Sequence, residues 1–514
     1  MTMATKNDQR FWLAAGLAVV LLSLVPKLYA TFSAPLWLDE AYTVWFSNQT
    51  FVDLWTWVPT FESHPPLYYS FMKMLTILPF SEGIVFRLAS LVCNMVTIVA
   101  AAVLVRKIGI QENAEHRFHV FFVVLFVSLH PELTWYASEA RPYAYEIMMI
   151  SLCMLSAYDI GNAPENAGFG KWLQFSVLVA LLNYAHYSAP LFGLSFYIYL
   201  FACNLARGGN VKAFGMLIAS GVLVTILCAP MLYFVAKQVM NWSGGSWVEE
   251  SSMRYVITKV YTIGKLGYFN QVLLERGWTL LCYAAIVIVY LKNIRALGSA
   301  LALCLLLIAL APTAMYLVTL LGPNIFLPRL IVPLALPFGV LIAVALVKVR
   351  NRYIVTVLCC VTAASFAFQT YTMMTEKPKG GYLRAFSVAL QEEYQPDDLL
   401  LFLPNSLELP LSLELEGLKN VPLDRVALPH VYPAIGVSDF YPAGTPSVPG
   451  LTEADADLIK AKIGSRNRVL VLTRIEELFD PSSVLRRTLA EMGFRSVRSM
   501  GEDIRPLYFD VYER

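Results

Sequence analysis

Long, almost uncharged apolar runs recur along this chain of 514 residues and restrict it to a membrane-spanning fold. A bilayer core is crossed by about 20 apolar residues in helical conformation, because a helix rises about 1.5 Å per residue. Residues 11–30, FWLAAGLAVVLLSLVPKLYA, meet this requirement with one charge near their end. Only 15% of all residues are charged, against about 25% in soluble domains. The sequence therefore predicts an α-helical polytopic membrane protein.

Ten further apolar runs follow the first, and they are residues 84–105, 118–136, 143–160, 172–187, 188–206, 213–235, 276–291, 296–321, 330–347 and 353–373. Eleven spans place the N-terminus in the cytoplasm and the C-terminus outside. This orientation is favoured because it leaves most short-loop Lys and Arg residues, such as Arg106, Lys107 and Arg117, on the cytoplasmic side. We expect a multi-pass protein integral to the inner (plasma) membrane, with a periplasmic C-terminal region.

A twelfth apolar stretch, residues 64–80, lies within the large first outer loop, residues 31–83. Counting it as a span would move the loop of Arg106, Lys107 and Arg117 to the outside, against the positive-inside rule. We therefore interpret it as a helix in the outer interface, with a tilted or re-entrant segment as the alternative.

The chain divides by composition into two domains. Residues 1–375 hold all eleven runs and form the predicted transmembrane domain. Residues 376–514 are polar and mix helix patterns (382–394 and 482–492) with strand patterns (399–403, 468–472 and 507–512), with a Pro/Gly-rich loop over 429–450. This pattern predicts a small extracytoplasmic α/β domain.

Ionisable residues gather at the outer ends of the predicted spans. Asp39 and Glu40 follow the first span, and adjacent carboxylates there suit general base or cation-holding work on a substrate at the membrane face. The alternatives are purely structural roles: an N-cap for Asp39 and a first-turn acid for Glu40. Further polar residues at the same face are His64, Glu139, Arg141, His186 and Arg329. For these the alternatives are loop charges, turn stabilisation and interfacial snorkelling.

An ordered set of motifs resembles the glycosyltransferase-C superfamily, in particular its polyprenyl-phosphate-sugar-dependent enzymes such as protein O-mannosyltransferases and lipid A aminoarabinose transferases. The motifs are Trp37-Leu38-Asp39-Glu40-Ala41, Ser63-His64-Pro65-Pro66-Leu67-Tyr68-Tyr69, Arg87 and Glu139-Ala140-Arg141-Pro142-Tyr143, and the resemblance covers roughly residues 10–350. Protein O-mannosyltransferases commonly have Gly-Lys where this chain has Tyr68-Tyr69. That departure argues against a direct protein-mannosylating equivalent.

The resemblance implies transfer of a sugar from a polyprenyl-phosphate-linked donor to an acceptor hydroxyl at the outer face. Direct displacement with one carboxylate as base would invert the anomeric carbon, following the logic of inverting glycoside hydrolysis. The leaving phosphate needs positive charge beside it. The expected catalytic residues are Asp39, Glu40 and Glu139. The expected substrate-binding residues are His64, Tyr68, Arg141, Tyr143, His186 and Arg329.

The expected partners are the lipid-linked donor, a lipid, polysaccharide or protein acceptor, and membrane lipids, with no nucleic acid. No metal site and no cofactor are expected, although a divalent cation held by Asp39, Glu40 and Glu139 is compatible with the chemistry. The alternative functions are a lipid-linked oligosaccharide ligase or phosphotransferase, and a lipid or sugar transporter. A ligase would use a pyrophosphate donor, and a transporter would bury charged residues and repeat its halves.

Overall fold

The computed structural model describes residues 6–62, 64–113, 117–241, 251–269, 271–322, 325–376, 380–416, 424–430, 450–500 and 507–514. The chain forms two compact units. The first contains Met1–Phe32, Gln49–Val239 and Val248–Glu376. The second contains Lys377–Arg514 together with Ser33–Asn48, so the segment that carries Asp39 belongs to the same unit as the C-terminal region.

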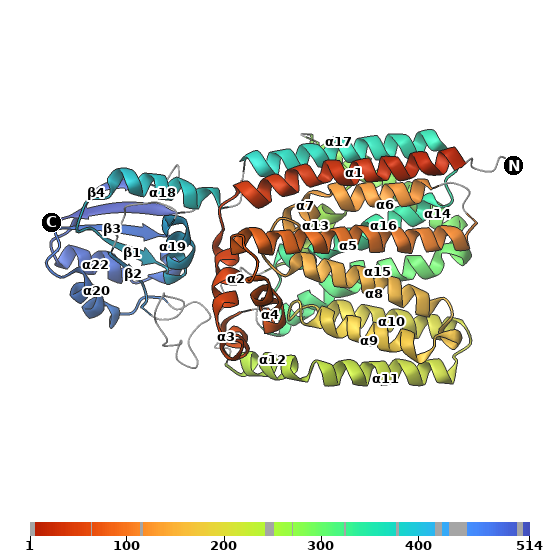
Figure 1. Cartoon of the computed structure of the whole chain (residues 1–514), viewed down its shortest axis with the longest axis horizontal. Helices are drawn as coiled ribbons and strands as arrows, with labels where there is room; N and C mark the ends of the chain where they lie inside the picture. Colours follow the sequence, from red (N-terminus) through yellow and green to blue (C-terminus); the bar gives the residue numbers. More distant parts are fainter. Residues whose placement is uncertain are drawn as a thin grey trace. The chain divides into compact units, whose positions relative to one another are not determined.

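The first unit is a helical bundle whose long helices lie roughly along one common axis (Figure 1). Its α-helices are α1 (Lys6–Ser33), α3 (Phe51–Phe61), α4 (Pro66–Leu75), α5 (Glu82–Gln111), α6 (Phe118–Leu129), α7 (Pro131–Tyr136), α8 (Tyr143–Gly161), α9 (Phe169–Asn183), α10 (Pro190–Ala206), α11 (Val211–Leu227), α12 (Ala229–Asn241), α13 (Met253–Gly264), α14 (Val272–Lys292), α15 (Ile294–Leu321), α16 (Ala335–Leu346) and α17 (Arg352–Glu376). The 3-10 helices η1 (Pro164–Asn166) and η2 (Pro328–Leu334) complete it.

Among the described residues, six helical stretches are long and apolar enough to cross a membrane, or seven if the bent pair α11 and α12 forms one span. The protein is therefore a multi-pass integral membrane protein. Each of the eleven apolar runs falls on a helix or a helix pair, but several of these helices are shorter than a full span, so the number eleven stays a prediction. Helix α4 has 10 residues, which is about 15 Å and too short to span, as an interfacial helix requires.

Helix α16 lies at the centre of the bundle, where it packs against α5, α6, α14 and α15. Its sequence, ALPFGVLIAVAL, is apolar on every side, and all of its residues are buried. A helix without a polar face is stable only when it is surrounded by other apolar elements or lipid. At Gly339 the packing is tight, since a Cβ there would lie 2.6 Å from Cδ1 of Phe126 on α6.

Lys27 of α1 is buried in the bundle although its side chain is polar. Its ammonium donates hydrogen bonds to Oδ1 of Asn94 on α5 (2.9 Å), to the carbonyl oxygen of Ser128 on α6 (2.9 Å) and to Oγ of Ser23 (3.3 Å). Many other side chains of α1 are exposed, including Leu13 and Leu22. Lys27 therefore ties the first span to two later helices through polar contacts.

The second unit contains a five-stranded sheet with strand order β2-β1-β3-β5-β4. Its strands are β1 (Leu399–Leu403), β2 (Asp424–Ala427), β3 (Arg468–Thr473), β4 (Arg495–Met500) and β5 (Tyr508–Glu513). Strands β2, β1 and β3 are parallel, while β5 is antiparallel to both β3 and β4. The helices of this unit are α2 (Leu38–Asn48), α18 (Gly381–Glu393), η3 (Asn405–Leu407), α19 (Glu408–Glu416), α20 (Asp455–Ile463), α21 (Glu476–Phe479) and α22 (Val484–Glu491).

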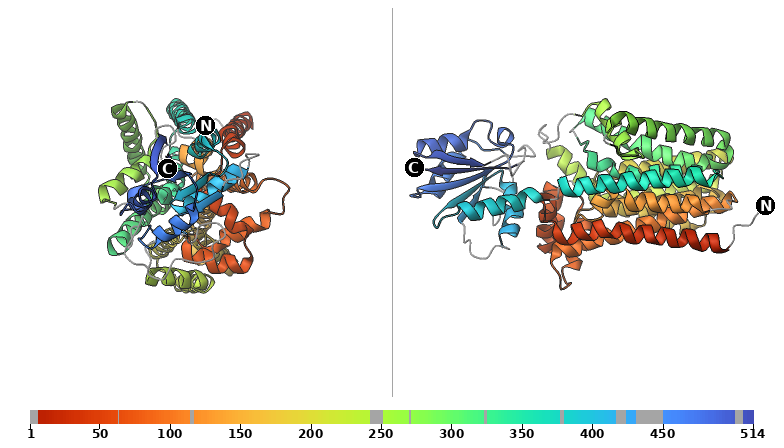
Figure 2. Two further views of the ribbon diagram at one scale, coloured as in Figure 1. Left: turned by 90° about the vertical axis from the view of Figure 1, so that its left-hand side faces the viewer. Right: turned by 90° about the horizontal axis from the view of Figure 1, so that it is seen from above.

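Helices cover both faces of this sheet, as Figure 2 shows. One face packs against α18 and α19 through Leu383, Phe386 and Leu411. The other face packs against α20 and α22 through Ile459 and Leu485. The predicted α/β character of the C-terminal region is confirmed.

The strand and helix patterns of this region correspond to β1, β3, β5, α18 and α22, whereas β2, β4, α19 and α20 were not predicted. The predicted loop over 429–450 lies mostly outside the described residues.

Candidate functional site

A cluster of polar side chains lies in the first unit, in loops where helices begin. Each of its main members stands close to a proline that opens the following helix: His64 before Pro66 of α4, Arg141 before Pro142 and α8, and Arg329 after Pro328 of η2. Proline suits the first helical position because its φ is already helical and it has no amide proton to leave unpaired. These prolines therefore fix where each loop ends and hold the polar residue beside a helix N-terminus.

Arg141 is the hub of the cluster and is buried. Its Nη1 donates a hydrogen bond to Oη of Tyr69 (3.0 Å). Its Nη2 donates to Oε2 of Glu62 (3.3 Å) and lies 3.1 Å from Nδ1 of His64, which is also 3.1 Å from Oε2 of Glu62. Glu62 compensates the charge of Arg141, and three side chains fix the plane of its guanidinium.

Two histidines pack edge to face beside Arg141, with the ring centroids of His64 and His186 4.6 Å apart. The backbone N–H of Ser188 donates to Nδ1 of His186 (3.0 Å), so the proton of this neutral ring resides on Nε2. Burial, followed by the charge of Arg141 and then of Arg329, lowers the pKa of His64 well below its usual value. Burial, His64 and the same arginines lower the pKa of His186 in the same direction, so both rings are neutral.

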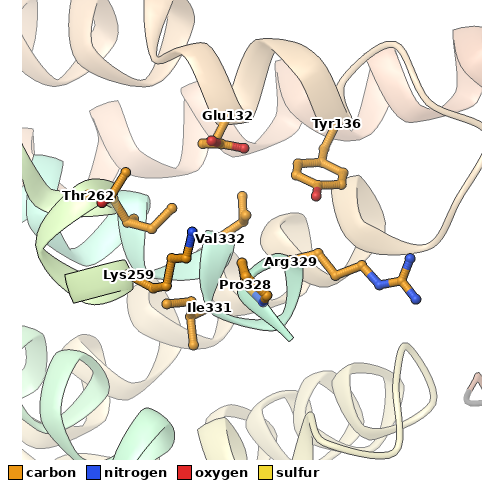
Figure 3. Close-up of a pocket in the computed structure, with 9 residues that line it drawn as sticks. Glu132, Tyr136, Lys259, Thr262, Pro328, Arg329, Ile331 and Val332 are labelled. Carbon is orange, nitrogen blue, oxygen red and sulfur yellow. The ribbon is translucent and has the colours of Figure 1, made fainter. Parts of the chain in front are cut away.

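Arg329 lines a pocket of about 100 Å³ in the same unit. The pocket has polar groups from three elements, as Figure 3 shows, and its lining residues are Glu132, Tyr136, Lys259, Thr262, Ile263, Pro328, Arg329, Ile331 and Val332. The Cζ of Arg329 lies 5.9 Å from the ring centroid of Tyr143, whose ring is 5.7 Å from that of His64. Tyr143 therefore links the pocket to the Arg141 cluster.

The pocket can hold about three water molecules, at roughly 30 Å³ each, which is room for a small anionic group and a few hydroxyls. It presents one carboxylate, Glu132, and two cations, Lys259 and Arg329. The net positive charge of these groups favours an anion. Among the described residues, no group of three or more His, Cys, Asp or Glu side chains is arranged to hold a metal ion.

The remaining predicted residues of the first unit lie next to this cluster. Glu139 is buried, and its backbone carbonyl accepts a hydrogen bond from Oγ of Ser90 (2.5 Å). Tyr68 is buried against Tyr69 with ring centroids 5.6 Å apart, and of the two it is Tyr69 that bonds Arg141. Arg87 donates to the carbonyl oxygens of Ala30 and Thr31 at the end of α1, a contact that stabilises a helix C-terminus.

Asp39 and Glu40 lie in the second unit, at the start of α2. Oε2 of Glu40 accepts a hydrogen bond from the backbone N–H of Trp37 (3.3 Å), as an acid at the third helical position does in a capping box. Glu40 is fully buried, whereas Asp39 is half-buried. The structure therefore brings His64, Arg141, Tyr143, His186 and Arg329 together in one unit and carries Asp39 and Glu40 on the other.

Sequence patterns assigned no role to several polar residues of the cluster and the pocket, and these are Glu62, Tyr69, Glu132, Tyr136 and Lys259. Glu62 stands just before the motif that begins at Ser63, and its partner Arg141 is 79 positions away, so no local pattern identifies it. Lys259 lies on α13, between the predicted spans 213–235 and 276–291, where no helix was predicted. Nothing in the local sequence separates it from Lys265 nearby.

No protein-family model and no curated protein matches the chain. Among solved structures, ArnT from Cupriavidus metallidurans in the apo state is similar over 96% of this chain and 97% of its own, with 13% identity and a TM-score of 0.58. The same protein bound to undecaprenyl phosphate gives 12% identity and the same TM-score of 0.58. Arabinofuranosyltransferase AftD from Mycobacteria is similar over 100% of this chain and 40% of its own, with 14% identity and a TM-score of 0.47.

ArnT is a member of the glycosyltransferase-C superfamily. Its likeness covers both units of this chain almost completely, which at this level of identity is evidence on the fold. The resemblance predicted from the sequence motifs is confirmed at that level: the chain has the glycosyltransferase-C fold.

Proposed function

We propose that this protein is a membrane glycosyltransferase that moves a sugar from a polyprenyl-phosphate carrier to an acceptor hydroxyl at the outer face of the inner membrane. The fold supports this proposal, because it is shared with an enzyme that has been solved bound to undecaprenyl phosphate. The apolar helices offer the lipid tail of such a donor a bilayer to lie in. The polar groups of the site lie at helix ends, where a phosphate headgroup resides.

The observation that carries the proposal is the cationic pocket beside the Arg141 cluster. Arg329 and Lys259 line a space large enough for a phosphate group. Arg141 adds a third positive charge that Glu62 and Tyr69 hold in place. Fixed cations stabilise the charge that develops on a leaving phosphate without reorganising during the reaction. We assign donor binding to Arg329, Lys259 and Arg141, with His64, His186, Tyr68 and Tyr143 shaping the site.

Asp39 is our candidate for the general base. It accepts the proton of the acceptor hydroxyl as that oxygen forms a bond with the anomeric carbon of the sugar. The bond between the anomeric carbon and the phosphate oxygen breaks at the same time, and the polyprenyl phosphate leaves with the bonding electrons. This single displacement inverts the anomeric carbon. Glu40 then positions Asp39 through the start of α2, and Glu139 acts as a second carboxylate of the site.

The function is tested in a strain from which the gene has been deleted. We expect mass spectrometry of its lipids to reveal an accumulated polyprenyl-phosphate sugar, which the wild-type gene removes. Asp39→Asn keeps the shape of the side chain but loses its basicity, so we expect turnover to fall by about two to four powers of ten. Binding of undecaprenyl phosphate to the purified variant in nanodiscs should equal that of the wild type.

Arg329→Lys should instead impair binding of the donor lipid. Its affinity for undecaprenyl phosphate should fall about tenfold, because an ammonium does not replace a guanidinium on phosphate. The matched control for Asp39→Asn is Asp53→Asn, because Asp53 also lies in the first turn of a helix and is not placed in the site. Normal removal of the lipid-linked sugar by Asp39→Asn would return this residue to a capping role. The absence of any accumulated lipid-linked sugar would refute the function itself.

A further inference from the structure

The parallel part of the sheet has a topological switch point between β1 and β3. Strand β1 pairs in parallel with β2 on one side and β3 on the other. After β1 the chain enters α19, which packs on the same face as α18, whereas after β3 it enters α22 on the opposite face. The chain thus leaves two adjacent strands toward opposite faces. In open α/β sheets, ligands bind outside the carboxyl ends of the strands at such a point.

The loops that leave these strands are tied together at their carboxyl ends. The backbone N–H of Arg474, after β3, donates to the carbonyl oxygen of Leu403 at the end of β1 (2.9 Å). Nδ2 of Asn405, after β1, donates to the carbonyl oxygen of Pro429 after β2 (2.9 Å). Three loops therefore form one fixed surface that presents the side chain of Arg474.

Most arginines of this unit are paired with a carboxylate, and Arg474 differs from them. It is half-buried, its Nε is buried without a hydrogen-bond partner, and it forms no ion pair within the described part of the chain. Arg425, on the neighbouring strand β2, lies 3.8 Å from the carboxylate of Glu408. Other arginines paired with carboxylates are Arg384, Arg466, Arg468, Arg486, Arg487 and Arg498. A half-buried guanidinium without a counter-ion is suited to an anionic ligand.

The segment that carries Asp39 packs against this same end of the sheet. Helix α18 leads into β1 and packs on it, so its first residues lie at the carboxyl end of β1. Pro35 touches this start, since a Cβ on Gly380 would lie 3.1 Å from Cγ of Pro35. Helix α2 also contacts α19, which starts at the same end.

Tyr382, in the first turn of α18, is near enough to Asp39 and Arg474 to be influenced by both charges. Burial raises the pKa of Tyr382, the charge of Arg474 lowers it and the charge of Asp39 raises it. Asp39 and Arg474 therefore both act on one phenol of the sheet unit.

We propose that Arg474 binds the acceptor substrate, and that this acceptor carries a phosphate or carboxylate group close to the hydroxyl that Asp39 activates. The proposal rests on the proposed function for the role of Asp39, but the anion site itself does not. It gives the C-terminal domain a part in binding the acceptor, through a side chain that belongs to the same unit as Asp39.

Binding is tested with glycerol 1-phosphate and with glycerol, two small alcohols of which only the first is anionic. The full-length protein is held in nanodiscs of phosphatidylcholine, and binding is measured by titration. We expect glycerol 1-phosphate to bind and glycerol not to bind. Arg474→Gln should weaken the affinity for glycerol 1-phosphate at least tenfold, the usual scale for losing a hydrogen bond to a charged group. Arg474→Lys should retain part of it.

Arg384→Gln is the matched control, because Arg384 lies on α18 in the same unit and is exposed. It should bind glycerol 1-phosphate as the wild type does. Equal affinity of Arg474→Gln and the wild type, or the absence of binding to the wild type, overturns the proposal.

A second measurement needs no variant. Glycerol 1-phosphate should slow the reaction of Arg474 with phenylglyoxal in the wild-type protein, as mapped by peptide mass spectrometry, and an unchanged rate overturns the proposal. Nanodiscs that also contain phosphatidylglycerol identify a lipid headgroup as the source of the anion if they slow the reaction without added probe. Asp39→Asn should bind glycerol 1-phosphate normally. If Asp39→Asn also keeps its turnover, the function of Asp39 fails while the anion site stands.

Discussion

Arg141 remains charged in a buried position because Glu62 and Tyr69 accept hydrogen bonds from its guanidinium. The Arg141 side chain is 3% exposed and that of Glu62 is 13% exposed. Removing one partner of a buried pair leaves the other charge without compensation, which costs about 3–5 kcal/mol. We expect Glu62→Gln to lower the free energy of unfolding by about 3 kcal/mol. Thermal unfolding of the detergent-solubilised protein measures the loss of stability. The affinity of the variant for undecaprenyl phosphate should fall as well.

The pair of Lys107 and Asp159 provides a control at the residue scale. Its side chains are 43% and 31% exposed, and exposed pairs contribute about 1 kcal/mol or less. Asp159→Asn should therefore change the unfolding temperature little. A Glu62→Gln variant that is as stable as Asp159→Asn would mean that Arg141 is compensated by another group.

Single residues of the site were predictable where a motif contains them, as for His64, Arg141 and Tyr143. Glu62 was missed because its role depends on Arg141, which is 79 positions away in the chain. The sequence also did not predict that Asp39 belongs to the same compact unit as the C-terminal sheet. The apolar runs and the charges of the short loops predict which end of each helix faces outward. They do not predict that α2 belongs to the unit of the C-terminal sheet.

At the scale of elements, α16 and α6 meet so closely that one methyl group disturbs them. A Cβ on Gly339 would lie 2.6 Å from the ring of Phe126, which is itself enclosed by Phe122, His130 and Phe366. Overpacking of this kind costs about 1–3 kcal/mol. We expect Gly339→Ala to lower the unfolding temperature of the solubilised protein.

The matched control for this contact is Gly215→Ala in α11, where nothing lies within 4 Å of the added Cβ. Alanine is the better helix former, by about 1 kcal/mol at most, so this variant should be as stable as the wild type or slightly more stable. Equal unfolding temperatures for both variants would mean that Phe126 moves aside without cost.

Element prediction succeeded where burial left a pattern. Strands β1 and β3 lie inside the sheet and are almost entirely apolar, so they were predicted. Strands β2 and β4 are the two edges of the sheet. Strand β2 has four residues, and β4 reads Arg-Ser-Val-Arg-Ser-Met with nearly every side chain exposed. An edge strand of this kind has no alternating apolar face, and therefore no signal of period two.

At the scale of the whole chain, two ion pairs support the alternation of the predicted spans. Lys107, near the end of α5, pairs with Asp159 near the end of α8 (2.5 Å). Lys348, just after α16, pairs with Glu112 just after α5 (2.7 Å). These helices are the second, fourth and tenth predicted spans, and an alternating topology requires all three to end on one side of the membrane.

With eleven alternating spans, the positive-inside rule predicts the N-terminus inside and the C-terminus outside. Alkaline phosphatase, which is active only outside the cytoplasm, should be active when fused after residue 379. The same reporter should be inactive when fused after Arg207, in a predicted cytoplasmic loop. A reversed pattern would contradict the positive-inside assignment, and an inactive fusion at both positions would contradict the odd number of spans.

The buried ammonium of Lys27 has a consequence for the order in which the protein is built. A lysine inside the bilayer costs up to about 3 kcal/mol on translocon scales when nothing compensates it. Only Ser23 is in the same helix, and the other two groups that accept hydrogen bonds from Lys27 are 67 and 101 positions later in the chain. While the ribosome is still synthesising α5 and α6, the first span therefore has to keep this charge near the membrane surface. Final seating of α1 is a late event in biogenesis, and it follows the insertion of the helices that receive it.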